Sequence, residues 1–123
     1  MSEGFGREAR LRSRGDFIAV QKTGRRAPGR FLTLLGQPND LGRDRLGIIA
    51  SRRVGNAVIR NRAKRRVREI FRRIHDPNAR PFDLVVIVRT ELVTVPLPVV
   101  AAEFQAALSK VRKSFKAPAS SQR

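Results

Sequence analysis

The side chains of this sequence best suited to chemistry are cationic, and most of them lie in one stretch. Ten positive charges fall between Arg52 and Arg73, and a single carboxylate, Glu69, opposes them. Arginine forks bind phosphate oxygens and stack on bases, so the stretch predicts a surface for nucleic acid. The ten are Arg52, Arg53, Arg60, Arg62, Lys64, Arg65, Arg66, Arg68, Arg72 and Arg73.

The whole chain carries the same bias. Its 123 residues include 27 Lys and Arg against 10 Asp and Glu, a formal net charge of +17. Such a field attracts polyanions. A merely solvated helix surface is the alternative, but it would alternate charge signs at a spacing of four residues. Here like charges recur at that spacing, at Arg60, Lys64, Arg68 and Arg72.

Groups for protein-based catalysis are sparse. The chain has one histidine, His75, and no cysteine, which excludes disulfides and thiolate-bound zinc. The carboxylates lack the spacing of an acid–base pair or a two-metal site, and no glycine-rich phosphate loop occurs. We expect His75 to help end a helix or to contact a phosphate. The sequence therefore predicts a binding module and no protein catalytic site.

The element that must position the cations is a helix over residues 57–74. Its apolar residues form one stripe of period 3.6, so the cations cover the remaining surface. Asn56 is a good N-cap, and Gly55 can take positive φ. Membrane-surface binding is disfavoured because the stripe looks like core. A DNA-reading helix is a further alternative, although nothing suggests a helix-turn-helix, and folded RNA fits better. The stripe comprises Ile59, Ala63, Val67, Ile70, Phe71 and Ile74.

The flanking patterns predict the rest of an α+β domain: a two-layer sandwich of one small mixed sheet with helices packed on it. A short helix carries Phe17 and Val20 and ends at Gly24. Strands are expected over 30–36, 46–51 and 82–88, the first two as a hairpin, with one more short strand near 25–27 or 51–54. A last helix covers 98–115. Residues 1–14 are expected to be a basic flexible arm, and 116–123 a disordered tail. With no signal peptide or long apolar run, we expect a cytoplasmic protein.

One continuous run resembles a known family. Residues 48–65 read IIASRRVGNAVIRNRAKR and resemble the signature of the protein subunit of bacterial ribonuclease P. The flanks agree, with Asp16-Phe17 and Val20 similar to the family's first helix, and residues 82–89 similar to its last strand. The resemblance covers roughly residues 5–115 and rests mainly on the long Arg-Asn-Arg motif around Asn61.

The resemblance implies a fold and a function. The fold has a left-handed βαβ crossover, similar to a domain of some ribosomal proteins, a hand that physical rules alone would not predict. The function is removal of the 5′ leader from precursor tRNA by a ribonucleoprotein. Its partners are a catalytic RNA and precursor tRNA, with no membrane or small-molecule substrate. Catalysis and the Mg²⁺ ions belong to the RNA.

The resemblance also implies site residues. Contacts with precursor leader are expected near Phe17, where bases can stack, although Phe17 could equally be a core residue. Gln21 and Leu35 stand where the family often has aromatics, so leader stacking is expected to be weaker. A structural RNA-binding protein of the ribosome or its assembly is the alternative function. Leader contacts are Phe17, Val20, Gln21, Leu35 and Arg89; catalytic-RNA contacts are Arg52, Arg53, Asn56, Arg60, Asn61, Arg62, Lys64, Arg65 and Arg68.

Overall fold

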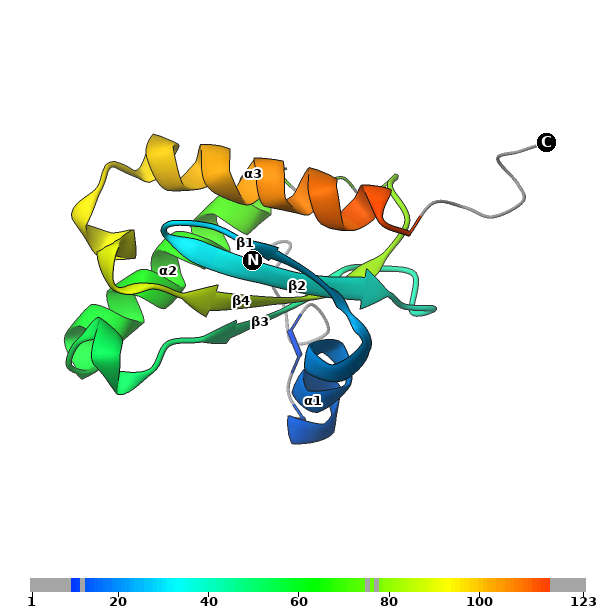
Figure 1. Cartoon of the computed structure of the whole chain (residues 1–123), viewed down its shortest axis with the longest axis horizontal. Helices are drawn as coiled ribbons and strands as arrows, with labels where there is room; N and C mark the ends of the chain where they lie inside the picture. Colours follow the sequence, from blue (N-terminus) through cyan, green and yellow to red (C-terminus); the bar gives the residue numbers. More distant parts are fainter. Residues whose placement is uncertain (1–9, 12, 75, 77, 116–123) are drawn as a thin grey trace.

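The computed structural model describes residues 10–11, 13–74, 76 and 78–115. In this part, helices lie on both faces of one four-stranded sheet (Figure 1). The predicted tail, most of the predicted arm and His75 fall outside the described residues. In chain order the elements are α1 (Arg14–Thr23), β1 (Arg25–Pro28), β2 (Leu32–Pro38), β3 (Arg45–Ile49), the 3-10 turn η2 (Arg52–Val54), α2 (Ala57–Ile74), β4 (Phe82–Val88), the 3-10 turn η3 (Thr90–Thr94) and α3 (Leu97–Lys113).

The strand order is β1-β2-β4-β3, which corrects the predicted hairpin. β2 and β3 are not neighbours, because β4 lies between them, antiparallel to β2 and parallel to β3. Val86 of β4 faces Leu34 on one side and Ile48 on the other. A strand that is apolar on both faces is best covered at the centre of a sheet, and β4 takes that place. The βαβ crossover, β3–α2–β4, joins the two parallel strands.

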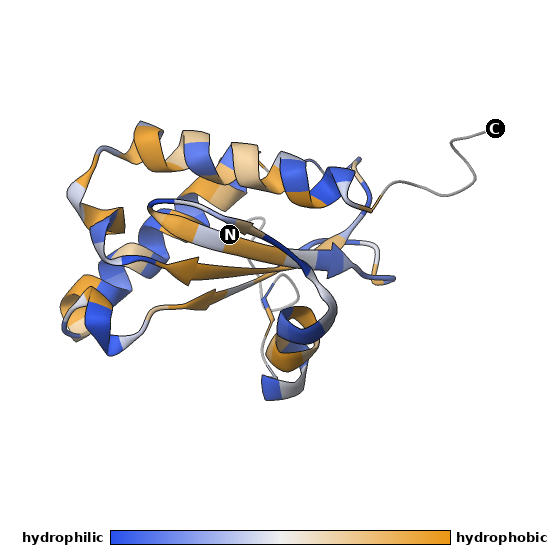
Figure 2. Ribbon diagram, in the orientation of Figure 1, coloured by the Kyte–Doolittle hydropathy of each residue, from blue (hydrophilic) through white to orange (hydrophobic). Residues whose placement is uncertain are grey.

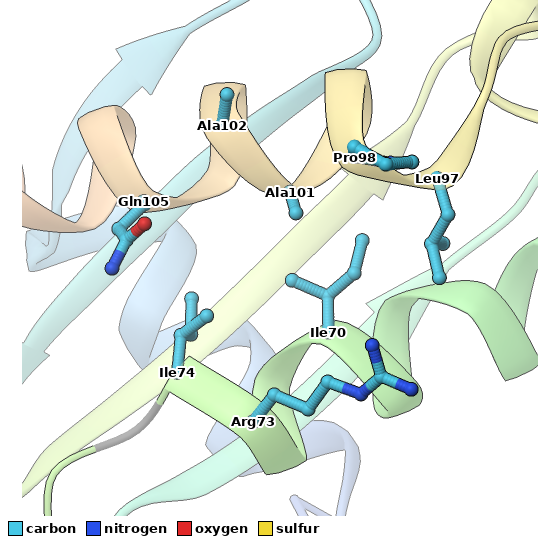
Figure 3. Close-up of a pocket in the computed structure, with 8 residues that line it drawn as sticks. All are labelled: Ile70, Arg73, Ile74, Leu97, Pro98, Ala101, Ala102 and Gln105. Carbon is cyan, nitrogen blue, oxygen red and sulfur yellow. The ribbon is translucent and has the colours of Figure 1, made fainter.

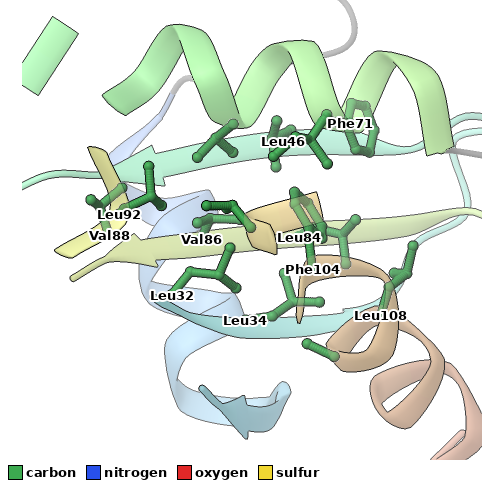
Figure 4. Packing of buried hydrophobic residues seen from close by; sticks show 14 of the residues in the cluster. Leu32, Leu34, Leu46, Phe71, Leu84, Val86, Val88, Leu92, Phe104 and Leu108 are labelled. Carbon is green, nitrogen blue, oxygen red and sulfur yellow. The ribbon is translucent and has the colours of Figure 1, made fainter. Parts of the chain in front are cut away.

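The core has two parts, one on each face of the sheet. Alternate residues of β4 point to opposite faces, so Leu84, Val86 and Val88 pack in the larger cluster with α2 and α3 (Figure 4). Val85 and Ile87 belong to the smaller cluster with α1. Figure 1 shows α1 and α3 on opposite sides of the sheet. The predicted α+β class is therefore confirmed, with α1 added on the second face.

The folded domain begins earlier than predicted. Leu11 is only 5% exposed, and its N–H donates to the Leu46 carbonyl at 3.0 Å. Arg10 forms a parallel bridge with Leu46, so this segment extends the sheet beyond β3. Ser13 then caps α1 by accepting from the Asp16 N–H at 3.0 Å. The expected arm through residue 14 is wrong for these residues, because one apolar side chain among basic ones produces no periodic signal.

A carboxylate of α3 fixes the turn between β1 and β2. Glu103 accepts three backbone N–H groups, those of Arg30 at 2.9 Å, Phe31 at 2.8 Å and Leu32 at 2.9 Å. Gly29 makes the approach feasible, since a Cβ there would lie 2.3 Å from the Glu103 carboxylate. These charge-assisted bonds anchor α3 over the β1–β2 side of the sheet.

Candidate nucleic-acid interface

The cations of α2 point away from the sheet because its apolar stripe is buried. Ala63, Val67, Ile70 and Phe71 are at most 2% exposed and pack in the larger core cluster. The helix runs over the predicted residues, Ala57–Ile74. Figure 2 shows hydrophilic segments recurring along the helices, against the apolar central strands. One side of α2 is therefore structural, and the other is available to a ligand.

All nine predicted catalytic-RNA contacts lie on η2, on α2 or at the α2 N-cap. Arg52, Arg53, Asn56, Asn61, Arg62 and Arg65 are exposed, and Arg60, Lys64 and Arg68 are half-buried. We call the seven cations of this set the basic side. Within the part of the chain that the structure describes, none of them pairs with a carboxylate. The seven cations of the basic side are Arg52, Arg53, Arg60, Arg62, Lys64, Arg65 and Arg68.

The other three cations of the stretch serve the fold. Arg66 donates through Nη1 to the carbonyls of Leu92, at 3.2 Å, and Val95, at 2.6 Å. Arg72 and Arg73 both pair with Glu69, and the second of these contacts is 2.8 Å. The hydrogen bond from Arg72 lowers the pKa of Glu69. Because these partners are internal, the charge available to RNA is smaller than the sequence count.

The start of α2 confirms the predicted cap. Asn56 Oδ1 accepts the N–H of Ile59 at 3.0 Å, which leaves the Asn56 side-chain amide NH₂ as the group that can face RNA. Gly55 has φ 151°, a conformation that favours glycine. A Cβ at Gly55 would also lie 2.8 Å from Ile59. Gly55 and Asn56 therefore set the point at which the basic helix leaves the η2 turn.

Electrostatic conditions on the basic side favour an anionic partner. Burial, together with the nearby charges of Arg10 and Arg65, lowers the pKa of Arg68. The Nε atom of Arg60 is buried and has no hydrogen-bond partner among the residues that the structure describes. Crowded like charges cost stability, and a phosphate bound at the surface would offset that cost.

The leader contacts predicted around α1 separate into exposed and buried residues. Phe17 is half-buried and Gln21 is exposed. Arg89 is exposed just after β4 and lines, with Arg53, a hollow of about 260 Å³. These three residues can reach a ligand, so their leader roles stay predictions.

The predicted role of Val20 and Leu35 as leader contacts is wrong. Val20 is 0% exposed and Leu35 is 4% exposed, both in the small cluster between α1 and the sheet. A wholly buried side chain cannot contact RNA while the fold is intact. We assign both to packing beneath α1, which holds Phe17 in place.

Two positioning residues were missed by the sequence reasoning. Gly47 makes room for the Phe17 ring, since a Cβ there would lie 2.6 Å from the ring carbons. Arg45 ties α1 to the sheet by pairing with Asp83 at 2.9 Å and with Asp16 at 3.4 Å. The hydrogen bond with Asp83 raises the pKa of Arg45. A glycine inside a strand pattern often marks such a close approach, so Gly47 carried a usable signal.

Other features of the described residues do not add to this interface. A hollow of about 360 Å³ between α2 and α3 is lined mainly by apolar side chains, with Arg73 at its border (Figure 3). No three His, Cys, Asp or Glu side chains gather as a metal-binding group among residues 10–11, 13–74, 76 and 78–115. Over the same residues, no helix has the length and apolar character needed to cross a membrane.

Known proteins share both the sequence and the fold. The family model "Ribonuclease P" matches residues 5–112. The ribonuclease P protein component of Thermotoga maritima is 44% identical over 92 residues, covering 75% of this chain and 79% of the relative. That of Stutzerimonas stutzeri is 41% identical over 106 residues, covering 85% of this chain and 80% of the relative.

Solved structures agree with the sequence matches. The RNase P protein of Thermotoga maritima superposes with a TM-score of 0.74 at 36% identity, covering 83% of this chain and 96% of the other. A mutant RNase P protein of Staphylococcus aureus, described as defective in mRNA degradation, gives 0.76 at 27% identity, with coverage of 85% and 89%.

Proposed function

The chain belongs to the ribonuclease P protein family, and we propose that it contacts two RNAs through two adjoining regions. It is the protein component of ribonuclease P and so a subunit of an endoribonuclease of tRNA 5′ maturation. Its RNA partner in the particle docks on the basic side. The leader of precursor tRNA lies near Phe17, Gln21 and Arg89. The observation that carries this assignment is the set of seven cations on η2 and α2 that pair with no carboxylate in the part of the chain that the structure describes.

The RNA performs the catalysis in this proposal. Two of the described carboxylates hold the fold: Asp83 pairs with Arg45, and Glu103 accepts from three backbone N–H groups. Mg²⁺ bound by the RNA supplies the hydrolytic chemistry. The protein's own contribution is to neutralise phosphates and to hold the leader, which strengthens precursor binding. We place this work in the cytoplasm.

Reconstitution tests the proposal directly. Purified protein alone should leave precursor tRNA intact, whereas protein with its cognate RNA and Mg²⁺ should cleave it at physiological salt. The protein should also tighten binding of precursor over mature tRNA. If added protein changes neither cleavage nor substrate binding, the proposed roles are wrong.

Sequencing the RNA that copurifies with the protein tests the alternative function. Recovery of a ribonuclease P RNA supports the proposal. Cosedimentation with ribosomal subunits, without that RNA, would instead indicate a structural ribosomal role. The match over residues 5–112 favours the first outcome.

A further inference from the structure

The hollow of about 260 Å³ that Arg53 and Arg89 line opens at the carboxyl ends of the parallel strands β3 and β4. The register pairs Ile49 with Ile87, so both strands end at the same edge of the sheet. The turns η2 and η3 follow these strands and contact each other. Ligands of open α/β sheets commonly bind beyond the carboxyl ends of their strands. The fold thus places this hollow where a bound ligand is expected.

The lining combines charges of both signs with apolar surface. Arg53 and Arg89 contribute guanidinium groups, and Glu91 contributes a carboxylate. Val54 and Val88, which are 8% and 5% exposed, contribute apolar side chains. The hollow therefore offers donors that suit a phosphate, an acceptor that suits N–H groups, and apolar contacts for a flat ring.

The backbone of Glu91 is held in place by the turn η3. The side chain of the next residue, Leu92, is 0% exposed, and the Leu92 N–H donates to the Arg89 carbonyl at 3.0 Å. The Thr94 hydroxyl donates to the Glu91 carbonyl at 2.8 Å, and Arg66 donates to the Leu92 carbonyl at 3.2 Å. A side chain on so firmly held a turn is preorganised for binding.

The Glu91 carboxylate pairs with no cation in the part of the chain that the structure describes, although Arg53 and Arg89 line the same hollow. In a surface that receives RNA, a carboxylate repels phosphates and weakens binding. That cost is offset where the carboxylate accepts hydrogen bonds from the RNA. Nucleobase N–H groups are the donors that can meet it.

We propose that this hollow binds one leader nucleotide and that Glu91 selects guanine as its base. The leader as the occupant rests on the proposed function. In this arrangement Arg89, which is already assigned to the leader, holds the phosphate of the nucleotide. A volume of about 260 Å³ lies just below the range of about 300–1,000 Å³ typical of small-molecule pockets, so it suits a single nucleotide.

The choice of guanine follows from the donors on each base. An ionised carboxylate only accepts hydrogen bonds, through two oxygens. Guanine presents two adjacent donors, its ring N–H and its amino group, so both oxygens are satisfied. Adenine and cytosine set their amino group beside a ring acceptor, which repels the second oxygen, and uracil presents one N–H between two carbonyls. Glu91 should therefore bind guanine best and uracil poorly.

Mononucleotides test this preference on the protein alone. Amide signals of Arg53 and Thr90 in ¹H–¹⁵N spectra should shift and saturate as guanosine 5′-monophosphate is added. Uridine 5′-monophosphate should need about a tenfold higher concentration, the discrimination expected of one bidentate contact to a base. Glu91→Gln should remove most of that difference. Asp40→Asn is the matched control, because it raises the +17 charge equally from an exposed position between β2 and β3, and it should keep the difference.

Three results would overturn the site: no saturable shifts, equal binding of the two nucleotides by the parent, or equal effects of Glu91→Gln and Asp40→Asn. The titration needs neither RNA nor cleavage, so a failure of the proposed function would be recognised separately.

Competition among leaders tests the occupant. A pool of precursor tRNAs with randomised leaders is offered to the reconstituted ribonucleoprotein, and the precursors that are cleaved first are sequenced. Guanine should be enriched at one leader position by the parent and by Asp40→Asn, but not by Glu91→Gln. A preference for guanosine 5′-monophosphate without this enrichment would reject the leader as the occupant.

Discussion

Replacing Arg62 by Ala should make RNA binding less dependent on salt by a defined amount. The basic side holds seven cations without carboxylate partners in the described part of the chain. If each neutralises one phosphate, the logarithm of affinity falls with the logarithm of salt with a slope of about −6, at about −0.9 per contact. Affinity should then fall about 10³- to 10⁴-fold between about 50 and 200 mM salt. Loss of Arg62 should lower the slope by about one.

Fluorescence anisotropy of the labelled cognate RNA, at several salt concentrations, measures this slope. Arg73→Ala is a suitable control, because Arg73 is an exposed arginine of the same helix that already pairs with Glu69 at 2.8 Å. Its charge is partly neutralised inside the protein, so its loss should change the slope much less than the loss of Arg62 does. An Arg62→Ala slope equal to that of the parent would remove Arg62 from the interface. Equal decreases for both variants would show that net charge alone acts, and would refute the assignment of a distinct basic side.

Four further outcomes test other parts of the structure. Phe17→Ala should weaken binding of precursor tRNA relative to mature tRNA by the loss of about 1–3 kcal/mol of base stacking; equal losses for both tRNAs would reject its leader role. Gly47→Ala would bring a methyl group to 2.6 Å from the Phe17 ring and should lower the free energy of unfolding by about 1–3 kcal/mol in a denaturant titration. Glu103→Gln weakens the three charge-assisted contacts of the β1–β2 turn and should cost about 1–3 kcal/mol in thermal unfolding, with the salt slope of RNA binding unchanged. The pKa of Glu69 is lowered in the folded state. Its stabilisation of α2 is therefore complete above the ordinary pKa of 4.5 and is lost as pH falls through the folded value. Circular dichroism of Glu69→Gln should lack that acid-dependent loss of helix.

The elements that were predictable are those with a strong local pattern. The helix α2 spans Ala57–Ile74 as predicted because six apolar residues recur at its period and Asn56 supplies its cap. The strand β4 is buried on both faces because its apolar run is continuous. In each case the information lies within fewer than about twenty consecutive residues, which is the range over which periodicity operates.

The strand order could not be obtained in the same way. β2 and β3 are neighbours in sequence with a turn between them, so a hairpin was the natural expectation. Instead, β4 pairs with both β2 and β3, which places this apolar strand at the centre of the sheet. The chain reaches that position only through the crossover that contains α2. Such a pairing is a property of the whole domain, and no local stretch of sequence encodes it.

The candidate site shows a comparable division. The spacing of the residues predicted which cations lie together on one side of α2. It did not show that the side chains of Val20 and Leu35 are buried. Both positions were inferred from the resemblance alone. Whether such a side chain contacts a ligand or packs in the core depends on how closely α1 approaches the sheet. Gly47, beneath the Phe17 ring, sets that approach.

The number of arginines also does not show which of them are available to bind RNA. Arg66 and Arg45 have partners within the protein, and each fixes an element to which we assign RNA contacts. Arg66 joins α2 to the two carbonyls around η3, close to Arg89, so the basic side and the end of β4 keep a constant separation. Arg45 joins α1 to β4, so the Phe17 ring keeps its place over the sheet. A guanidinium that satisfies buried acceptors makes the surface rigid, and a rigid surface loses less conformational entropy when it binds. In the proposed interface, arginine therefore has two roles: some arginines bind the RNA, and others preorganise the surface that receives it.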